Sequence, residues 1–293
     1  MITHQYTVAH WTYRIHFVEG GLNDDTLIPS SKVFETPVDN TPAVFELTVD
    51  DSFRPKETGR EVGQFDCAGT NHGVYLREDG SYEIRLTDYL QRQCCLIDVA
   101  ADFSRATVAL NGTRDMRTFG LNNTLMMMYA FSTADKGTLL MHSSVVREKG
   151  RGYMFLGVSG TGKSTHTANW LRFVPDTDLM NDDNPVVRFV DGETHVYGSP
   201  WSGKTPCYRK VEAPVGAFVQ LKQAPHNSIR RQQVVEAFAT LVPSCSVMKW
   251  DRRVYGGVVD TVGQILGVTP VYFLENLPDE AAVRLSYNTI TAQ

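Results

Sequence analysis

The first part of the chain is a series of short segments in which hydrophobic and polar residues alternate. Alternation over about four to eight residues predicts strands that bury one face. The segments of this kind are TYRIHFV, AVFELTV, GVYLRE, YEIRLT, CLIDVA and ATVALN. Asp79–Gly80 separates two of them and predicts a hairpin, because glycine accepts positive φ. No stretch before about residue 120 shows convincing helical periodicity.

From Leu121 onward, helical and strand patterns follow one another. LNNTLMMMYAFSTADKG predicts a helix with a cap at Asn122 or Asn123 and a stop at Gly137. The elements expected after it are, in order, the strands GTLLMHSSVV and GYMFLGV, the helix KSTHTANWLRF, a strand that carries Asp182 and Asp183, a hairpin at Asp191–Gly192, the strand GAFVQLK, the helix RRQQVVEAFATLV, the strand TPVYFLEN and the helix LPDEAAVRL. The helix RRQQVVEAFATLV is expected to be amphipathic, with an apolar face formed by Val234, Val235, Phe238, Leu241 and Val242. These patterns predict a mixed-sheet α/β (α+β) fold, with a β-rich domain at residues 1–125 and an α/β domain at residues 126–293.

Composition and charge exclude several classes of protein. The net charge of −5 over 293 residues argues against a nucleic-acid binder that relies on a basic surface. The N-terminus lacks a basic region followed by an apolar run, and LMMMYAF is too short to span a bilayer. The five cysteines are odd in number and lack metal-ligand spacing. We therefore expect a cytoplasmic protein with no membrane and no nucleic-acid partner.

One motif carries a specific chemistry. GVSGTGKST, from Gly157 to Thr165, matches G-x-x-x-x-G-K-[ST] between an expected strand and an expected helix. Backbone N–H groups of such a loop, here Ser159, Gly160, Thr161, Gly162 and Thr165 among them, converge on the phosphates of a nucleotide. Lys163 supplies a positive charge to the β- and γ-phosphates, and Ser164 supplies a hydroxyl ligand to Mg²⁺. The motif predicts ATP and Mg²⁺ as cofactors.

The adjacent acids Asp182 and Asp183 interrupt an otherwise apolar strand pattern. Mg²⁺ prefers oxygen ligands and is held by one or two carboxylates together with phosphate oxygens. Neighbours on a strand face opposite ways, so both acids reach one ion only if the strand ends in a turn before Pro185. A solvated turn without a metal is the alternative interpretation of this segment.

The ordered set HSS (His142 to Ser144), GVSGTGKST and NDDNPV resembles the catalytic domain of the HPr kinase/phosphorylase family. That domain is similar in fold to phosphoenolpyruvate carboxykinase, and the resemblance covers about residues 135 to 225. It implies that Ser164 and Asp183 hold Mg²⁺ and that Lys163 binds the phosphates. It also implies that Asp182 is the catalytic base and that His142 lies against Asp182. A homo-oligomer is a further expectation from the resemblance.

Parts of the chain depart from the family pattern. The glycine-rich second signature of bacterial HPr kinases is replaced by GSPWSGKTPCYRK, and the N-terminal part does not resemble theirs. These differences argue against HPr as the substrate. Ser199, Trp201 and Lys204 could form a substrate clamp, or the tryptophan could simply anchor a loop. Two arginine pairs are further candidates for anion contacts, against the alternative of solvated helix ends: Arg230–Arg231 and Arg252–Arg253.

The leading hypothesis is a kinase that uses ATP and Mg²⁺ to phosphorylate a hydroxyl of a small molecule, peptide or protein. The first alternative is a nucleotide-binding sensor or accessory protein without turnover. A carboxykinase-type enzyme acting on a small carboxylic acid is a third hypothesis. The sequence does not identify the acceptor or the role of the β-rich domain.

Overall fold

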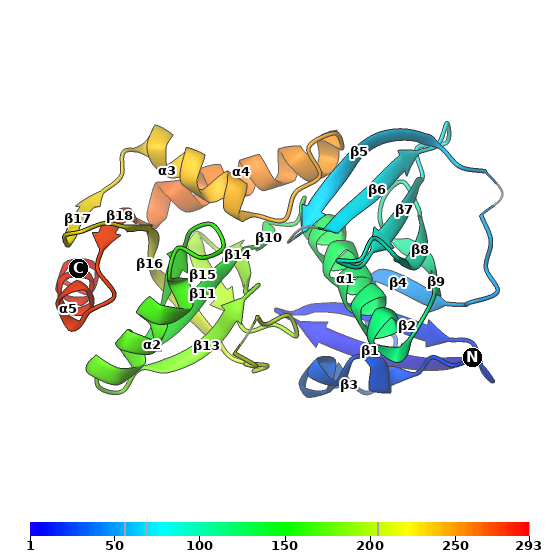
Figure 1. Cartoon of the computed structure of the whole chain (residues 1–293), viewed down its shortest axis with the longest axis horizontal. Helices are drawn as coiled ribbons and strands as arrows, with labels where there is room; N and C mark the ends of the chain where they lie inside the picture. The colour runs from blue at the N-terminus through cyan, green and yellow to red at the C-terminus, as the bar shows by residue number, and fades with distance from the viewer. Residues whose placement is uncertain (56, 68–69, 204, 293) are drawn as a thin grey trace. The chain divides into compact units, whose positions relative to one another are not determined.

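The chain forms two compact units. The structure is a computed structural model that describes residues 1–55, 57–67, 70–203 and 205–292. The first unit comprises Met1–Thr133 with Met248–Arg252, and the second comprises Ala134–Val247 with Arg253–Gln293 (Figure 1). The division expected between residues 125 and 126 would cut through helix α1 (Arg114–Thr133), which belongs to the first unit over its whole length.

The first unit is built on one mixed sheet. Its strands are β1 (Ile2–Val8), β2 (Trp11–Phe17), β3 (Glu35–Thr36), β4 (Ala43–Val49), β5 (Arg60–Cys67), β6 (Thr70–Leu76), β7 (Tyr82–Thr87), β8 (Gln93–Val99) and β9 (Arg105–Leu110), and two 3₁₀ helices, η1 (Asp25–Leu27) and η2 (Pro29–Phe34), precede β3. The strand order is β3-β1-β2-β4-β9-β8-β7-β6-β5, with β4 parallel to both β2 and β9. The expected strands are all present, and the Asp79–Gly80 turn joins β6 to β7 as an antiparallel hairpin.

Helix α1 covers one face of this sheet and packs against β4, β8 and β9. The alternation expected in the strands places Tyr13 and Phe45 on the buried face, where their rings stack at 4.8 Å. The helix begins at Arg114, so the expected caps at Asn122 and Asn123 are wrong. Gly120 and the polar residues beside it interrupt the apolar pattern of the first turns of the helix. The sequence pattern therefore did not predict that the helix begins as early as Arg114.

The second unit also contains one mixed sheet. Its elements are β10 (Thr138–Leu140), β11 (Ser143–Glu148), β12 (Arg151–Leu156), α2 (Lys163–Phe173), β13 (Asp178–Asp183), β14 (Val186–Val190), β15 (Glu193–Tyr197), β16 (Glu212–Gln223), β17 (Ser228–Arg231), α3 (Val234–Leu241), η3 (Val242–Ser244), α4 (Arg252–Val268), β18 (Val271–Asn276) and α5 (Glu280–Ile290). The main strand order is β10-β14-β15-β16-β12-β11-β13; β18 also pairs with β16, and β17 pairs with β18. The neighbours β12, β16 and β18 are parallel.

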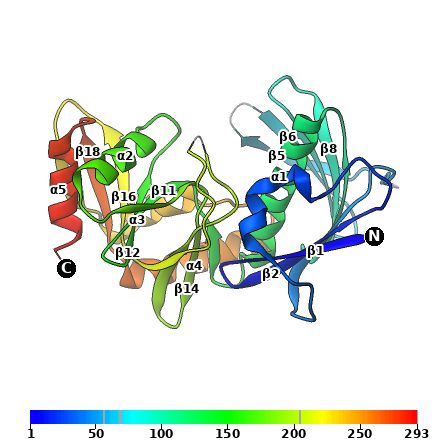
Figure 2. The ribbon, with the colours of Figure 1, turned by 90° about the horizontal axis from the view of Figure 1, so that it is seen from below.

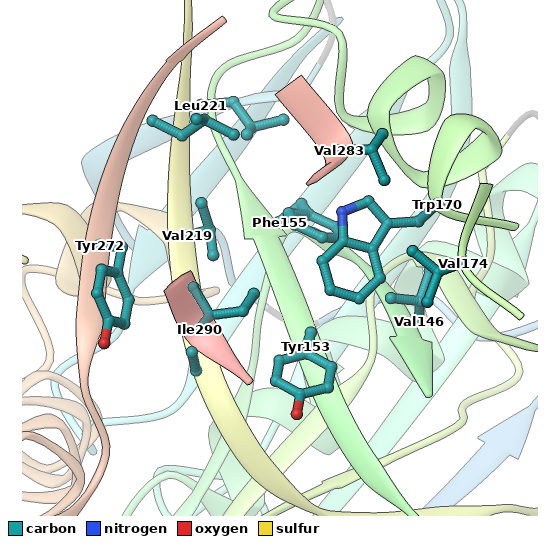
Figure 3. Packing of buried hydrophobic residues seen from close by; sticks show 12 residues of the cluster. Val146, Tyr153, Phe155, Trp170, Val174, Val219, Leu221, Tyr272, Val283 and Ile290 are labelled. Atoms are coloured by element: carbon teal, nitrogen blue, oxygen red, sulfur yellow. The ribbon is translucent and has the colours of Figure 1, made fainter. Parts of the chain in front are cut away.

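The parallel strands of the second unit are buried on the face that carries α2 and α5. Tyr153 and Phe155 of β12 pack there against Trp170 of α2, which is fully buried (Figure 3). Val283 and Ile290 of α5 belong to the same cluster. In Figure 2, α2 and α5 lie next to each other beside β16 and β18. The core therefore fixes α2 against the end of β12, where the glycine-rich loop joins them.

Two helices differ from the sequence expectation. In α3, Val234 and Val235 are 67% and 83% exposed, so the apolar face predicted from RRQQVVEAFATLV is wrong at these positions. Helix α4 was not predicted, although Val254, Val258 and Ile265 form its buried stripe. Its glycines lower helix propensity and obscure the pattern. Gly257 is needed for packing, because a Cβ there would lie 2.4 Å from the Ala134 carbonyl oxygen. None of the helices in the described part of the chain is both long and apolar enough to cross a bilayer.

A buried histidine, His166, lies in α2 just after the glycine-rich loop. His166 Nε2 lies 3.2 Å from Trp170 Nε1, which donates to it, and 3.2 Å from Ser286 Oγ. Burial lowers the pKa of His166 from its ordinary value of 6.5 to about 4. The neutral ring therefore joins α2 to α5, and protonation would remove the acceptor that Trp170 uses.

We predict that this histidine makes the folded state sensitive to mild acid. The pKa of His166 is lower when folded, so its contribution is complete above pH 6.5 and is lost as pH falls toward 4. The free energy of unfolding should fall by about 2 kcal/mol between pH 7 and pH 5 through this residue alone. Urea denaturation of the wild type and His166→Gln at both pH values measures the difference between their pH dependences. Asn288→Gln, at an exposed position without a titratable group, is the control and should keep the wild-type dependence. Equal pH dependence in wild type and His166→Gln would contradict the prediction.

Candidate active site

The glycine-rich loop joins β12 to α2, as the sequence predicted, and α2 has the expected bounds Lys163–Phe173. Gly162 occupies the N-cap with φ of 96°, and Gly157 has φ of 151°. A Cβ at Gly157 would lie 2.5 Å from Thr161 Oγ1, so the loop needs glycine there. The His166 N–H donates to Gly162 O at 2.8 Å. The N–H groups of Lys163, Ser164 and Thr165 in the first turn therefore have no partner within the helix and can bind an anion.

Lys163 is folded back over the loop. Its Nζ donates to Gly157 O at 2.7 Å and lies 3.0 Å from His142 Nε2. Burial lowers the pKa of the Lys163 ammonium, and the negative charges of Asp183 and Asp182 oppose that shift. The lysine therefore lies within electrostatic reach of both acids of the pair.

Asp182 faces two serine hydroxyls. It is 5% exposed, and its Oδ1 accepts hydrogen bonds from Ser144 Oγ at 2.5 Å and Ser164 Oγ at 3.1 Å. Ser144 comes from β11, whose pairing with β13 places it opposite Asp182. Ser164 is in the first turn of α2. A carboxylate and a hydroxyl therefore converge beside the glycine-rich loop, and both are oxygen ligands that suit Mg²⁺.

Asp183 faces the other way and pairs with His142. The Asp183 Oδ1 lies 2.9 Å from His142 Nδ1, and the Asp183 side chain is 32% exposed. An ammonium group only donates hydrogen bonds, so His142 Nε2 accepts from Lys163 and the proton resides on Nδ1. His142 thus donates to Asp183 and not to Asp182, against the expected contact. Neighbours on a strand face opposite sides, which explains why the two acids have different partners.

A buried amide holds the turn that follows the acids. Asn181 is fully buried, and its Oδ1 accepts from the N–H groups of Asp183 and Asn184, each at 3.0 Å. Its Nδ2 donates to Ser199 Oγ at 3.2 Å and to Trp201 O at 3.1 Å. Asn181 therefore joins the end of β13 to the segment that begins at Ser199, and it holds the backbone of the turn at Asp183.

The residues considered for a substrate clamp are mostly inside the protein. Ser199 is fully buried and donates to Asn184 O at 2.6 Å, and Trp201 is 3% exposed. These contacts favour the alternative in which the tryptophan anchors a loop. Lys204 lies outside the described residues. Nearby, Gly203 N–H donates to Asp182 O at 2.9 Å, so this loop supports the acid pair from behind.

In each of the two arginine pairs considered as anion contacts, one arginine forms an ion pair with an acidic residue. Arg230 forms a bidentate contact with Glu236, at 2.6 and 2.8 Å, and Arg253 lies 2.9 Å from Asp135. These two arginines are therefore not directed at the glycine-rich loop. Sequence reasoning gave no role to Ser144 and Asn181, although both stand within the segments it singled out.

Comparison with known proteins finds no family model that matches the chain and no curated protein that matches it.

We predict that the turn at the acid pair depends on Asn181. Asn181→Ala removes the acceptor of two N–H donors at a partly buried turn and one of the two hydrogen bonds to the Trp201 carbonyl oxygen. It should lower the free energy of unfolding by about 3 kcal/mol. Urea denaturation checks this value. Asn288→Ala, on the exposed face of α5, is the matched control and should change stability by less than about 0.5 kcal/mol. A loss of the same small size in both variants would show that Asn181 does not hold the turn.

Proposed function

We propose that this protein is a kinase that transfers the γ-phosphate of a nucleoside triphosphate, with Mg²⁺, to a hydroxyl of its acceptor. The observation that supports it most is the arrangement around the glycine-rich loop. Ser164 and Asp182 converge on one side of the arrangement. On the other side, His142 lies between Asp183 and Lys163 and contacts both. The resemblance of the same segments to the HPr kinase/phosphorylase catalytic domain agrees with this proposal.

In the proposal, the backbone N–H groups of the loop and of the first turn of α2 bind the phosphates. Lys163 would leave the Gly157 carbonyl to reach them, because a phosphate oxygen is a stronger partner for an ammonium than a neutral carbonyl. Ser164 and Asp182 would hold Mg²⁺. When bound, the ion neutralises charge on the phosphates during transfer.

The roles of the two acids are exchanged relative to those that the resemblance implies. Asp182 shares hydrogen bonds with Ser164 and is nearly buried, which suits a ligand of the ion that Ser164 binds. Asp183 is more exposed and lies against His142, so an acceptor hydroxyl can approach it. We therefore assign Asp182 to the metal and Asp183 to the base.

The transfer step follows from these positions. Asp183 takes the proton of the acceptor hydroxyl as that oxygen bonds to the γ-phosphorus, and the bond from the γ-phosphorus to the bridging oxygen breaks to release the nucleoside diphosphate. His142 donates its Nδ1–H to Asp183 and holds the carboxylate in place. A positioned general base contributes a factor of about 10² to 10⁴.

The transfer and binding assays described below also distinguish two other functions. A nucleotide sensor would use the loop and Lys163 for binding and would need no base. A carboxykinase-type enzyme would act on a carboxylic acid instead of a hydroxyl.

We predict that substitution of the two acids has different effects on transfer and on nucleotide binding. Asp183→Asn should lower the rate of γ-phosphate transfer by a factor of about 10² to 10⁴ and leave nucleotide affinity nearly unchanged. Asp182→Asn should weaken the dependence of nucleotide binding on Mg²⁺, because an amide is a poorer ligand than a carboxylate. Transfer is measured against libraries of metabolites, small carboxylic acids and peptides, and binding by titration calorimetry with and without Mg²⁺.

Asp260→Asn, at an exposed position on α4, is the matched control and should behave as the wild type in both assays. Transfer at the wild-type rate by Asp183→Asn would rule out this residue as the base. Nucleotide binding without transfer to any acceptor would favour the sensor. Decarboxylation of an acid coupled to the nucleotide would favour the carboxykinase.

A further inference from the structure

Two adjacent serines of β11 are equally buried and have different surroundings. Ser143 and Ser144 are 0% and 1% exposed. The pairing of β11 with β13 places Ser143 opposite Asp183 and Ser144 opposite Asp182. The Ser144 hydroxyl is hydrogen-bonded to Asp182, whereas the Ser143 hydroxyl makes no hydrogen bond with any residue that the structure describes. The transfer step proposed above uses neither hydroxyl, so the contact of Ser144 with the acid pair has no function assigned to it.

The direction of this hydrogen bond is fixed by its partners. A carboxylate only accepts hydrogen bonds, so the single hydroxyl proton of Ser144 is donated to Asp182 Oδ1, at 2.5 Å between the oxygens. Ser164 Oγ lies 3.1 Å from the same Oδ1 and 3.3 Å from Oδ2. Within the described part of the chain, Oδ2 has only this longer contact. One oxygen of the carboxylate is therefore held by two hydroxyls, and the other is left freer.

The backbone that carries Ser144 is held on both sides. β11 lies between β12 and β13, and Ser144 is opposite Phe155 in one pairing and opposite Asp182 in the other. Side chains directly opposite each other on antiparallel strands share a face, so a short serine side chain can reach the aspartate. Val146, two residues further along β11, belongs to the buried cluster around Trp170. Ser144 is therefore kept in place by the strand pairing and by the core.

The contact matters because Asp182 is nearly buried. Only 5% of this residue is exposed, and a buried carboxylate is unfavourable unless it accepts hydrogen bonds. A hydrogen bond to a charged group is about twice as strong as one between neutral groups. Groups that hold a metal ligand in its orientation commonly change metal affinity by about 10- to 100-fold.

We infer that Ser144 is a positioning residue of the proposed Mg²⁺ site. Its hydroxyl holds Asp182 Oδ1 and thereby leaves Oδ2 as the oxygen that binds the ion together with Ser164. Ser144 itself contacts neither the nucleotide nor the acceptor. This inference rests on the proposed function, since it takes Asp182 as a ligand of the ion.

Titration calorimetry of the full chain tests the inference with a non-hydrolysable ATP analogue, in Mg²⁺ and in EDTA. Ser144→Ala should weaken the affinity of the protein–analogue complex for Mg²⁺ by about 10- to 100-fold. Its affinity for the analogue in EDTA should stay nearly unchanged, because the loop N–H groups and Lys163 bind the phosphates without Asp182. Ser143→Ala, from the same strand and equally buried, is the matched control and should keep the wild-type values in both conditions.

A second pair of variants separates the hydrogen bond from packing. Ser144→Thr and Ser144→Val have side chains of similar size, and only threonine keeps the hydroxyl. The threonine variant should bind Mg²⁺ about 10- to 100-fold more tightly than the valine variant. A purely structural role of Ser144 would affect both variants equally. This comparison also stands if Ser144→Ala does not fold.

The outcomes distinguish this inference from the proposed function. Wild-type Mg²⁺ affinity in Ser144→Ala, an equal loss in Ser143→Ala, or equal affinities of the threonine and valine variants would overturn the role of Ser144 and leave the kinase proposal standing. Binding of the analogue to the wild type with no dependence on Mg²⁺ would overturn the metal site and Ser144 with it. If the wild type binds no analogue in either condition, the proposed function itself fails.

Discussion

The register between β11 and β13 is the constraint on which the candidate site depends. It places Ser144 opposite Asp182 and Ser143 opposite Asp183. Because side chains alternate along a strand, a slip by one residue would exchange the faces of the two acids. Asp182 would then lose Ser144 and Ser164, and Asp183 would lose His142. The antiparallel pairing of β11 with β12 carries the same register to the start of the glycine-rich loop. One set of strand pairings thus positions a hydroxyl, two carboxylates and a lysine together.

The core behind the sheet keeps this arrangement rigid. Trp170 joins the buried aromatic residues of β12 to α5, so the first turn of α2 cannot move without disturbing the packing. Protein interiors are close-packed and deform little. The polar groups of the site therefore rest on a hydrophobic cluster on one face and on the Asn181 hydrogen bonds at the end of β13. This combination suits a site whose function requires fixed positions.

Much of this fold follows from local patterns, and the exceptions have physical reasons. Six strands of the first unit alternate clearly and were predicted, whereas β1, β3 and β5 were not. The helix KSTHTANWLRF was predicted because the glycine-rich motif before it requires a helix to follow. Helix α4 was missed because four glycines interrupt its stripe, and Gly257 is there to admit the Ala134 carbonyl. The apolar face of α3 was misassigned because Val234 and Val235 have helical spacing but are exposed. The spacing of hydrophobic residues within a segment does not show which side of a helix packs against the core.

The same limit explains what could be foreseen of the site. The sequence identified the residue types and the order of the segments, since glycine, lysine and paired acids have recognisable chemistry. It could not decide which acid faces which partner, because Asp182 and Asp183 are adjacent and chemically identical. Their difference comes from contacts with distant strands and helices: Ser144 and Ser164 for one, His142 for the other. Two identical side chains next to each other can therefore carry different roles only because tertiary pairing gives them different neighbours. An assignment of base and metal ligand must start from those neighbours.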